Sequence, residues 1–320
     1  MIVNNTLGYA IEQDDVSLSR TVRFWIFLIL IVPSVYCSFL VLFHLFVDKN
    51  LRSQLGNHIV INLLIIGLIT EFVDIPFHLV FLQTGRVQPS TPALCLAWWF
   101  FDLGLYNGCT VIMAWSSVHR YFLIFHSRLF RTANNRFLFH YLPLILLNIY
   151  IVLFYFIVIM FPPCVNIYNY SLPVCNNFPC YLNDPLLGIW DSVANGICPT
   201  LITTISSITV LCRVYYQKMR LQQINLWRKQ RKMTIQLLSV CILYLIANIP
   251  LNVMIFAHLC GLPQVVGASE ESYFNYLCYF VTLLFPFVCL GILAELKKKI
   301  QWKGIFLFRR SLQIGMIHPQ

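Results

Sequence analysis

Three observations predict that this sequence forms an all-α membrane protein, a bundle of seven transmembrane helices. Hydrophobic residues make up 59% of the chain and charged residues only 11%, with a mean hydropathy of +0.73. The apolar residues gather in seven long stretches, and most basic residues lie on one side of them. A soluble domain carries about 25% charged residues. The composition therefore excludes a water-soluble globule, a disordered chain and a collagen.

Each apolar stretch is long enough to cross a bilayer as a helix. A crossing takes about 20 apolar residues, because ~30 Å of hydrocarbon is covered at ~1.5 Å per residue. In chain order the stretches are 22–47, 57–82, 93–118, 137–161, 186–215, 233–259 and 273–293. Apolar residues run on within each stretch instead of alternating, which favours helices over a β-barrel.

The remaining segments divide the chain into three parts. Residues 1–21 form a polar, acidic tail without a basic leader, so we expect no cleavable signal peptide. Residues 22–294 form the seven-helix domain, and residues 295–320 form a cytoplasmic tail. Leu296 and Ile300 share one helical side among lysines, which predicts a short amphipathic eighth helix on the membrane surface. A solvated basic tail is the alternative.

Two signals orient the bundle in the membrane. With the N-terminus outside, 19 of the 22 lysines and arginines fall in inner segments, and only Arg20, Arg23 and Arg86 fall outside. Basic residues collect on the cytoplasmic side of membrane proteins. The two N-x-[ST] sequons, at Asn4 and Asn169, then lie outside, where they can be glycosylated. We expect a multi-pass plasma-membrane protein with a cytoplasmic C-terminus, whose net charge of +10 reflects topology and not nucleic-acid binding.

Five cysteines are predicted at or near the outer face, where thiols are oxidised. They are Cys95, Cys164, Cys175, Cys180 and Cys260. Four of them can form two disulfides, which leaves one over. Their spacing matches no common zinc pattern, so we expect no metal ligand among them.

The third stretch ends in a recognisable motif. Residues 117–126 read SVHRYFLIFH, and the family-like positions within them are Arg120, Tyr121, Ile124 and His126. This pattern resembles the rhodopsin-like (class A) G-protein-coupled receptors, whose third helix ends in Asp/Glu-Arg-Tyr followed by Ile and often His. Here His119 replaces the acid. The chain is similar to divergent peptide-type receptors of invertebrates, and the resemblance extends over residues 22–302.

Further positions fit the resemblance in part. Cys95 lies 25 residues before Arg120, where the family places the cysteine that is bridged to its second outer loop. Cys180 is the first choice of partner, with Cys164–Cys175 as a second, local disulfide. Cys175 is the rival partner of Cys95, and the sequence leaves the pairing open.

Three prolines also fit, and two family positions do not. Pro199, Pro250 and Pro286 correspond to the helix-kink prolines of the fifth, sixth and seventh helices. Gly67 and Phe285 replace the polar pair that holds a sodium ion in many relatives. We therefore do not expect modulation by sodium.

The resemblance implies a receptor that couples to a heterotrimeric G protein at its inner end. The residues implied in coupling are His119, Arg120, Tyr121, Ile124, Arg228, Lys229, Arg231 and Lys232. For the last four, a plain membrane-surface charge is the alternative. His119 cannot hold Arg120 as a carboxylate would, because a neutral imidazole carries no negative charge. We expect a weak inactive-state lock and basal signalling, unless another inner group holds Arg120.

Four acids lie inside the predicted spans, where acids are costly and usually face the bundle interior. They are Glu71, Asp74, Asp102 and Asp191. Glu71 and Asp74 share the i, i+3, i+7 spacing of one helical face with His78. A site with several acids and no base prefers a cation, an amine or a small cationic peptide. A purely structural cluster of helix-to-helix hydrogen bonds is the alternative.

The expected ligand contacts combine these acids with neighbouring polar residues. They are Asp102, Asp191, Asn195, Asn252, Tyr276, Tyr279, Glu71 and Asp74. By the resemblance, Asp102 takes the position that pairs with a ligand cation in amine receptors, and Tyr279 the position of a tyrosine bonded to that acid. A short peptide is favoured over an amine, because Leu251 and Asn252 stand where amine receptors have aromatic residues after Pro250.

Two other classes of function were weighed against a receptor. A transporter or channel would use Glu71, Asp74 and Asp102 as a path for protons or cations. An enzyme is not expected, because no HExxH motif or nucleophile elbow accompanies the acids. We expect no cofactor, and as partners an extracellular ligand, a G protein and the lipid bilayer.

Overall fold

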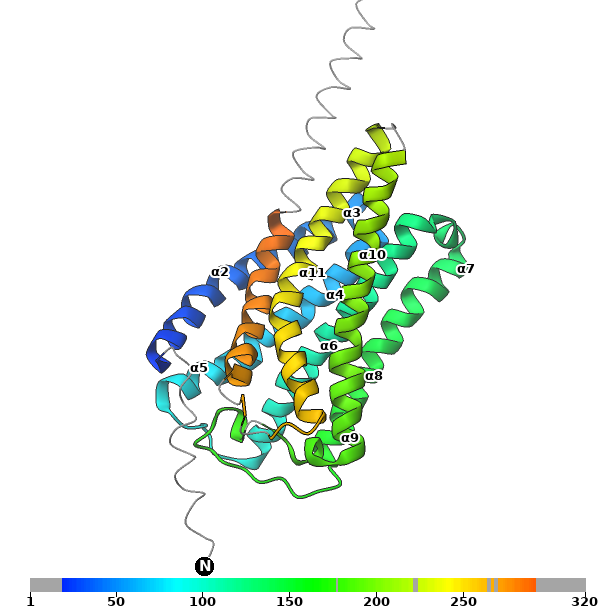
Figure 1. Cartoon of the computed structure of the whole chain (residues 1–320). Helices are drawn as coiled ribbons and strands as arrows, with labels where there is room; N and C mark the ends of the chain where they lie inside the picture. Colours follow the sequence, from blue (N-terminus) through cyan, green and yellow to red (C-terminus); the bar gives the residue numbers. More distant parts are fainter. Residues whose placement is uncertain (1–18, 177, 221–223, 264–265, 268–269, 292–320) are drawn as a thin grey trace, which may run out of the picture.

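The structure, a computed structural model, describes residues 19–176, 178–220, 224–263, 266–267 and 270–291, and within these every regular element is a helix. Figure 1 shows the helices gathered in one elongated bundle. The elements are α2 (Arg20–Val47), α3 (Lys49–Arg52), α4 (Leu55–Ile69), η1 (Thr70–Asp74), α5 (Ile75–Thr84), α6 (Pro92–Phe125), η2 (Ser127–Phe130), α7 (Ala133–Arg136), η3 (Phe137–Tyr141), α8 (Leu142–Met160), η4 (Pro173–Cys175), η5 (Cys180–Asn183), α9 (Pro185–Trp190), η6 (Asp191–Ile197), α10 (Cys198–Arg220), α11 (Ile224–Leu259) and the helix Glu270–Gly291. The predicted eighth helix within 295–320 and the tail to residue 18 lie outside the described residues.

Among the described residues, six helices are long and apolar enough to cross a membrane. They are Arg20–Val47, Leu55–Thr84, Ala133–Met160, Pro185–Arg213, Cys241–Leu259 and Glu270–Gly291. They correspond to six of the seven predicted stretches, so the all-helical fold is confirmed for the described residues, and six of its helices have the length and composition of membrane spans. The remaining stretch, 93–118, forms α6, which is 34 residues long but less apolar than the other six.

The low apolarity of α6 follows from its place in the bundle. It contacts α4, α8, α10 and α11, so its sides meet protein more than lipid. Several of its polar side chains are buried against these neighbours: Asn107, Thr110, Ser116, Ser117, His119 and Arg120. A helix surrounded by partners can carry polar groups that would be costly against hydrocarbon.

Three wide π-helical turns occur in the described bundle, and each stands just before a proline. η1 precedes Pro76, η3 precedes Pro143 and η6 precedes Pro199. In each case the residue before the proline donates its N–H five residues back, as from Ile75 to Thr70. Proline has no N–H, and its ring clashes with the carbonyl four residues earlier. A turn with one extra residue relieves that clash. The other two predicted kink prolines, Pro250 and Pro286, lie inside α11 and the helix Glu270–Gly291.

A disulfide-linked loop, residues 161–184, lies across one end of the bundle, at the beginning of α6 (Figure 1). We call this the cystine end. Cys95 in the first turn of α6 is bonded to Cys175, and Cys164 is bonded to Cys180. All four predicted cysteines are therefore used, but Cys95 takes the rival partner and not Cys180. Cys260, the cysteine left over, is free and exposed.

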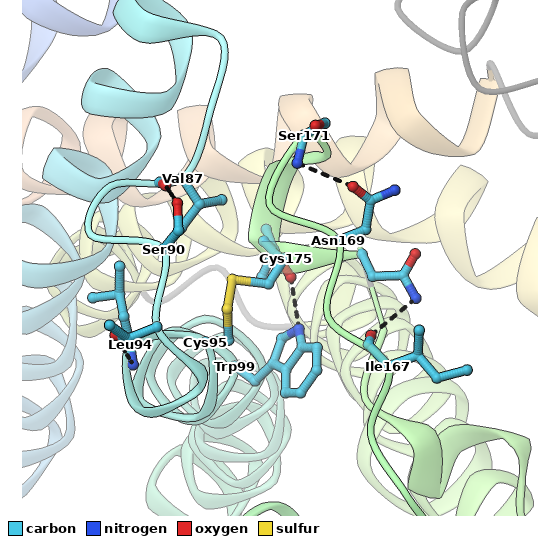
Figure 2. Close-up of a disulfide and its surroundings, with 12 residues drawn as sticks. Val87, Ser90, Leu94, Cys95, Trp99, Ile167, Asn169, Ser171 and Cys175 are labelled. Atoms are coloured by element: carbon cyan, nitrogen blue, oxygen red, sulfur yellow. Dashed lines mark hydrogen bonds between the residues drawn. A yellow bond between two sulfur atoms is a disulfide. The ribbon is translucent and has the colours of Figure 1, made fainter.

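Hydrogen bonds around the Cys95–Cys175 disulfide hold the loop in place (Figure 2). The Trp99 indole N–H donates to the carbonyl of Val174 over 2.7 Å. Trp99 also stacks on Tyr168 with ring centroids 5.6 Å apart. These contacts explain the choice of Cys175, because Trp99 lies one turn after Cys95 and binds the residue next to Cys175. In the same loop Asn169 bonds the backbone N–H of Ser171 over 3.1 Å, whereas the other sequon, Asn4, lies outside the described residues.

Non-reducing peptide mapping by mass spectrometry is expected to recover Cys95 linked to Cys175 and Cys164 linked to Cys180. Cys180→Ser should leave α6 tied to the loop, and Cys175→Ser should release it. Each loss should lower the thermal midpoint, since removing a native disulfide costs about 2–5 kcal/mol. Recovery of a Cys95–Cys180 peptide from the wild-type chain would contradict the pairing.

Candidate functional site

A cluster of four polar side chains joins three helices in the half of the bundle next to the cystine end. Asp74 ends η1, His78 follows it by one turn in α5, and Asp102 lies two turns after Cys95 in α6. Tyr279 comes from the helix Glu270–Gly291. Asp74 is buried, whereas the other three are half-buried. Residues far apart in the chain therefore form one site, which we call the Asp102 cluster.

Tyr279 is the centre of this cluster. Its hydroxyl donates to Asp102 Oδ1 over 2.5 Å and lies 2.6 Å from His78 Nε2. A hydroxyl has a single proton. Since that proton goes to Asp102, His78 must carry its own proton on Nε2 and donate to the tyrosine oxygen. The hydrogen bond between Asp102 and Tyr279, expected from the family resemblance, is present.

Asp74 completes the cluster from the other side. Its Oδ1 accepts the indole N–H of Trp98 over 2.9 Å and lies 3.7 Å from His78 Nε2. One ligand atom from each of Asp74, His78 and Asp102 can be chosen so that all three lie within 4.8 Å of one another. Carboxylates and imidazole are zinc ligands, and two carboxylates also attract an ammonium or guanidinium group. The chemistry of the cluster is that of a cation site.

Glu71 does not belong to this cluster, although its spacing placed it on the face of Asp74 and His78. Its carboxylate accepts the Ser34 hydroxyl, which also lies 2.8 Å from the carbonyl of Leu283. Glu71 thus faces α2, and the Ser34 hydroxyl links it to the helix Glu270–Gly291. The reason is the π-turn η1, whose extra residue breaks the regular 3.6-residue phase on which the expected face depended. For Glu71 the geometry fits the structural alternative.

Asp191 and Asn195, both predicted ligand contacts, form a second, closed network. The Asp191 carboxylate accepts the hydroxyls of Tyr155 and Tyr181, the latter over 3.0 Å, and the Asn195 amide over 2.7 Å. The Asn195 oxygen in turn accepts the hydroxyl of Tyr150 over 2.9 Å. Asp191 is only 4% exposed. Its donors come from three elements, so this network binds η6 to α8 and to the loop.

The last two predicted contacts differ in what they bind. The Asn252 amide donates to the carbonyl of Asn248 over 2.8 Å and to the Thr200 hydroxyl over 3.2 Å, which joins α11 to α10. Tyr276 packs its ring on Phe27, with centroids 5.1 Å apart. Its buried hydroxyl has no hydrogen-bond partner among the described residues.

At the opposite end of α6, Arg120 is 9% exposed and bonds across to α11. Its guanidinium donates to the Ser116 hydroxyl over 2.9 Å and to Cys241 Sγ over 3.2 Å. His119 points elsewhere, with its Nε2 2.9 Å from His140 Nδ1. Two groups other than His119 therefore hold Arg120, which is the alternative considered from the sequence.

The other predicted coupling residues lie near Arg120 or outside the described side chains. The ring of Tyr121 lies 5.2 Å from the guanidinium carbon of Arg213 in α10. The remaining five occupy helical positions whose side chains the structure does not describe: Ile124 in α6, and Arg228, Lys229, Arg231 and Lys232 in α11.

The tyrosines that bond Asp191 were missed by the sequence analysis. Tyr155 lies 36 residues before Asp191, and Tyr181 lies 10 residues before it. Neither separation corresponds to a helical repeat that a sequence pattern can reveal. The indole N–H of Trp98, which fixes Asp74, was not among the expected contacts either.

Compared with known proteins, the chain matches no family model and no curated sequence.

Asp191→Ala is expected to destabilise the bundle far more than Tyr181→Phe. The alanine leaves three buried donors without their acceptor, at about 1–3 kcal/mol each, whereas Tyr181→Phe removes one donor at about 1 kcal/mol. The thermal midpoint in detergent micelles measures both. Equal effects of the two substitutions would show that the Asp191 network does not hold η6, α8 and the loop together.

Proposed function

We propose that this chain is a seven-helix receptor of the rhodopsin-like type, which transmits the binding of an extracellular cationic ligand to a heterotrimeric G protein. One observation carries the proposal. Near its two ends α6 is bonded to two different helices, by Asp102 to Tyr279 of the helix Glu270–Gly291 and by Arg120 to Cys241 of α11. Asp102 and Arg120 are 18 residues apart, roughly 27 Å along the helix.

The membrane arrangement in this proposal includes α6 as the seventh span. Its 34 residues exceed the length of a crossing, and its neighbours supply the partners that its polar side chains need. The distribution of Lys and Arg supports a plasma-membrane orientation with the cystine end outside, where oxidised cysteines and glycosylation at Asn169 belong. The Arg120 end is then cytoplasmic.

The ligand in this proposal is a small cationic peptide or an amine that binds at the Asp102 cluster. A ligand ammonium or guanidinium competes with the Tyr279 hydroxyl for Asp102 and draws on the charge of nearby Asp74. That competition changes the bond between α6 and the helix Glu270–Gly291. A ligand shifts a two-state equilibrium by the difference in its affinity for the two states.

In this proposal the Arg120 end of the bundle contacts the G protein. When Arg120 leaves Cys241, α6 and α11 lose one of their cross-helix bonds, and a G-protein segment can contact Arg120 and Tyr121. The hydrogen bond from Tyr106 to Asn248 still joins the two helices nearer the cystine end. Arg228, Lys229, Arg231 and Lys232 then serve as basic contacts for the G protein or for the membrane surface. Because Cys241 is a neutral and weak acceptor, the inactive state is held less firmly than by a carboxylate.

Basal GTP exchange on a panel of G-protein α-subunits tests the proposal. Membranes containing the wild-type chain are expected to exchange nucleotide above background, and Arg120→Ala should reduce exchange to background. Cys241→Ala should raise it by about threefold, the effect of one weak hydrogen bond. Cys212→Ala, at an exposed position in α10, is the matched control.

The preferred α-subunit then serves in a screen of cationic peptides and amines, with Asp102→Asn as the control for binding at the cluster. Well-expressed wild-type protein that is silent both alone and throughout the screen would contradict the proposed coupling.

A transporter or channel for cations is the second candidate. The observation that favours it is the convergence of Asp74, His78 and Asp102, which is the kind of cation and proton site that transport proteins place inside the membrane. Glu71 is less suited to such a path than the sequence suggested, because its carboxylate is bonded to Ser34 of α2 and not to the Asp102 cluster.

Reconstituted vesicles separate the two candidates. For a receptor, we expect sodium and proton flux no greater than in protein-free vesicles. A flux that is lost in Asp74→Asn, Asp102→Asn and Glu71→Gln, and kept in Asp184→Asn, would favour the transporter. Asp184 is a suitable control because its carboxylate caps α9 outside the Asp102 cluster.

A further inference from the structure

A basic cavity lies at the Arg120 end of the bundle, between the turn that joins α3 to α4 and the continuous helical segment formed by α7 and η3. Its volume is about 430 Å³. The polar side chains that line it are Lys49, Arg52, Ser53, His58, Arg136 and Tyr141. This volume falls within the range of small-molecule sites, about 300–1,000 Å³.

Hydrogen bonds from the first turn of α4 hold one wall of the cavity. Asn57 Nδ2 donates to the carbonyl of Leu51 over 2.8 Å, and His58 Nε2 donates to the carbonyl of Arg52 over 2.9 Å. Leu51 itself is 2% exposed and anchors α3 in the core. The backbone beneath Lys49 and Arg52 is therefore fixed, and these two side chains start from a rigid turn.

A chain of three histidines holds the opposite wall. His58 Nδ1 lies 3.1 Å from His140 Nε2, and His140 Nδ1 lies 2.9 Å from His119 Nε2. Because His58 Nε2 donates to a carbonyl, its Nδ1 accepts in the neutral state, so His140 donates to His58 and His119 donates to His140. The ring of Tyr141 packs on His58, with centroids 5.6 Å apart. The cavity is thus connected to the residue next to Arg120.

The charge in the cavity is unbalanced. Lys49, Arg52 and Arg136 all line it, and within the described part of the chain none of the three makes an ion pair. All three side chains are exposed, so water screens much of their mutual repulsion, and an anion held between them would reduce it further. Two of them are arginines, whose guanidinium groups bind phosphate in a bidentate manner. Tyr141, whose side chain carries a hydroxyl, also lines the cavity.

The position of the cavity indicates the depth at which its ligand is found. Three candidate spans have one end beside it: Arg20–Val47 has its C-terminal end here, and Leu55–Thr84 and Ala133–Met160 have their N-terminal ends here. The ends of spans lie at the level of the lipid headgroups. Basic pockets at this level bind phosphorylated headgroups.

We propose that this cavity binds a polyphosphate anion of the phosphorylated inositol class, with Arg52 and Arg136 as the principal ligands and Lys49 at the rim. The same chemistry is offered by a membrane phosphoinositide and by a free inositol phosphate. The site is independent of G-protein coupling, because binding requires only these side chains.

Binding is measured by calorimetry on the purified full-length protein in detergent micelles. The probes are dioctanoyl phosphatidylinositol 4,5-bisphosphate, the same lipid without ring phosphates, and soluble inositol 1,4,5-trisphosphate. We expect the bisphosphate lipid to bind at least tenfold more tightly than the lipid without ring phosphates. Arg52→Gln and Arg136→Gln should each weaken binding about fivefold, the effect of one basic residue near a headgroup.

Arg131→Gln is the matched control, because Arg131 is exposed in the turn between η2 and α7 at the same end and does not line the cavity. It should change affinity less than twofold, and all three variants should keep the wild-type thermal midpoint. Binding of both lipid and soluble headgroup assigns the site to the headgroup from either source, and binding of the lipid alone assigns it to the membrane. Equal losses in Arg131→Gln and Arg52→Gln, or no preference for ring phosphates, would overturn the proposal. No G protein is present, so the result is independent of the signalling experiment.

Discussion

A polar group buried inside a membrane bundle must find its partner within the protein, and the arrangement of this chain depends on that constraint. α6 carries more of these groups than any single neighbour can satisfy. Its Asp102 is bonded to Tyr279, its Asn107 to Tyr155 over 2.6 Å, and its Arg120 to Cys241. Each bond reaches a different helix. The polar side chains of α6 therefore fix which helices surround it and in what rotation.

The π-turns show how the same constraint acts on the backbone. Each proline widens the turn before it, and the widened turns carry buried polar residues: Glu71 and Asp74 in η1, His140 in η3, and Asp191 and Asn195 in η6. An extra residue in a turn rotates the side chains before it relative to those after it. Acids that a regular helix would present on one face are thereby delivered to different neighbours, as with Glu71 and Asp74.

The sequence predicted the helices well and the polar networks only in part. Apolar length is a local property, so six of the seven stretches could be recognised as membrane helices directly. The bond from Tyr279 to Asp102 was also foreseen, because a family pattern relates the two positions. The separation of Glu71 from Asp74 was not, since a π-turn has no sequence period. The Cys95–Cys175 pairing was only the rival alternative, because it is selected by the contact of Trp99 with Val174 in the folded loop.

The modest apolarity of α6 has a consequence for the assembly of the newly synthesised protein. If α6 is the seventh span, only two of the other spans, Arg20–Val47 and Leu55–Thr84, precede it, whereas Tyr155, Cys241 and Tyr279 have not yet been made. The transfer of α6 into lipid is less favourable than that of the other six helices, and most of its polar partners are synthesised later. The polar side chains of α6 can therefore all be paired only after the last helix has been synthesised. α6 is therefore fully stabilised only when the C-terminal helices are present.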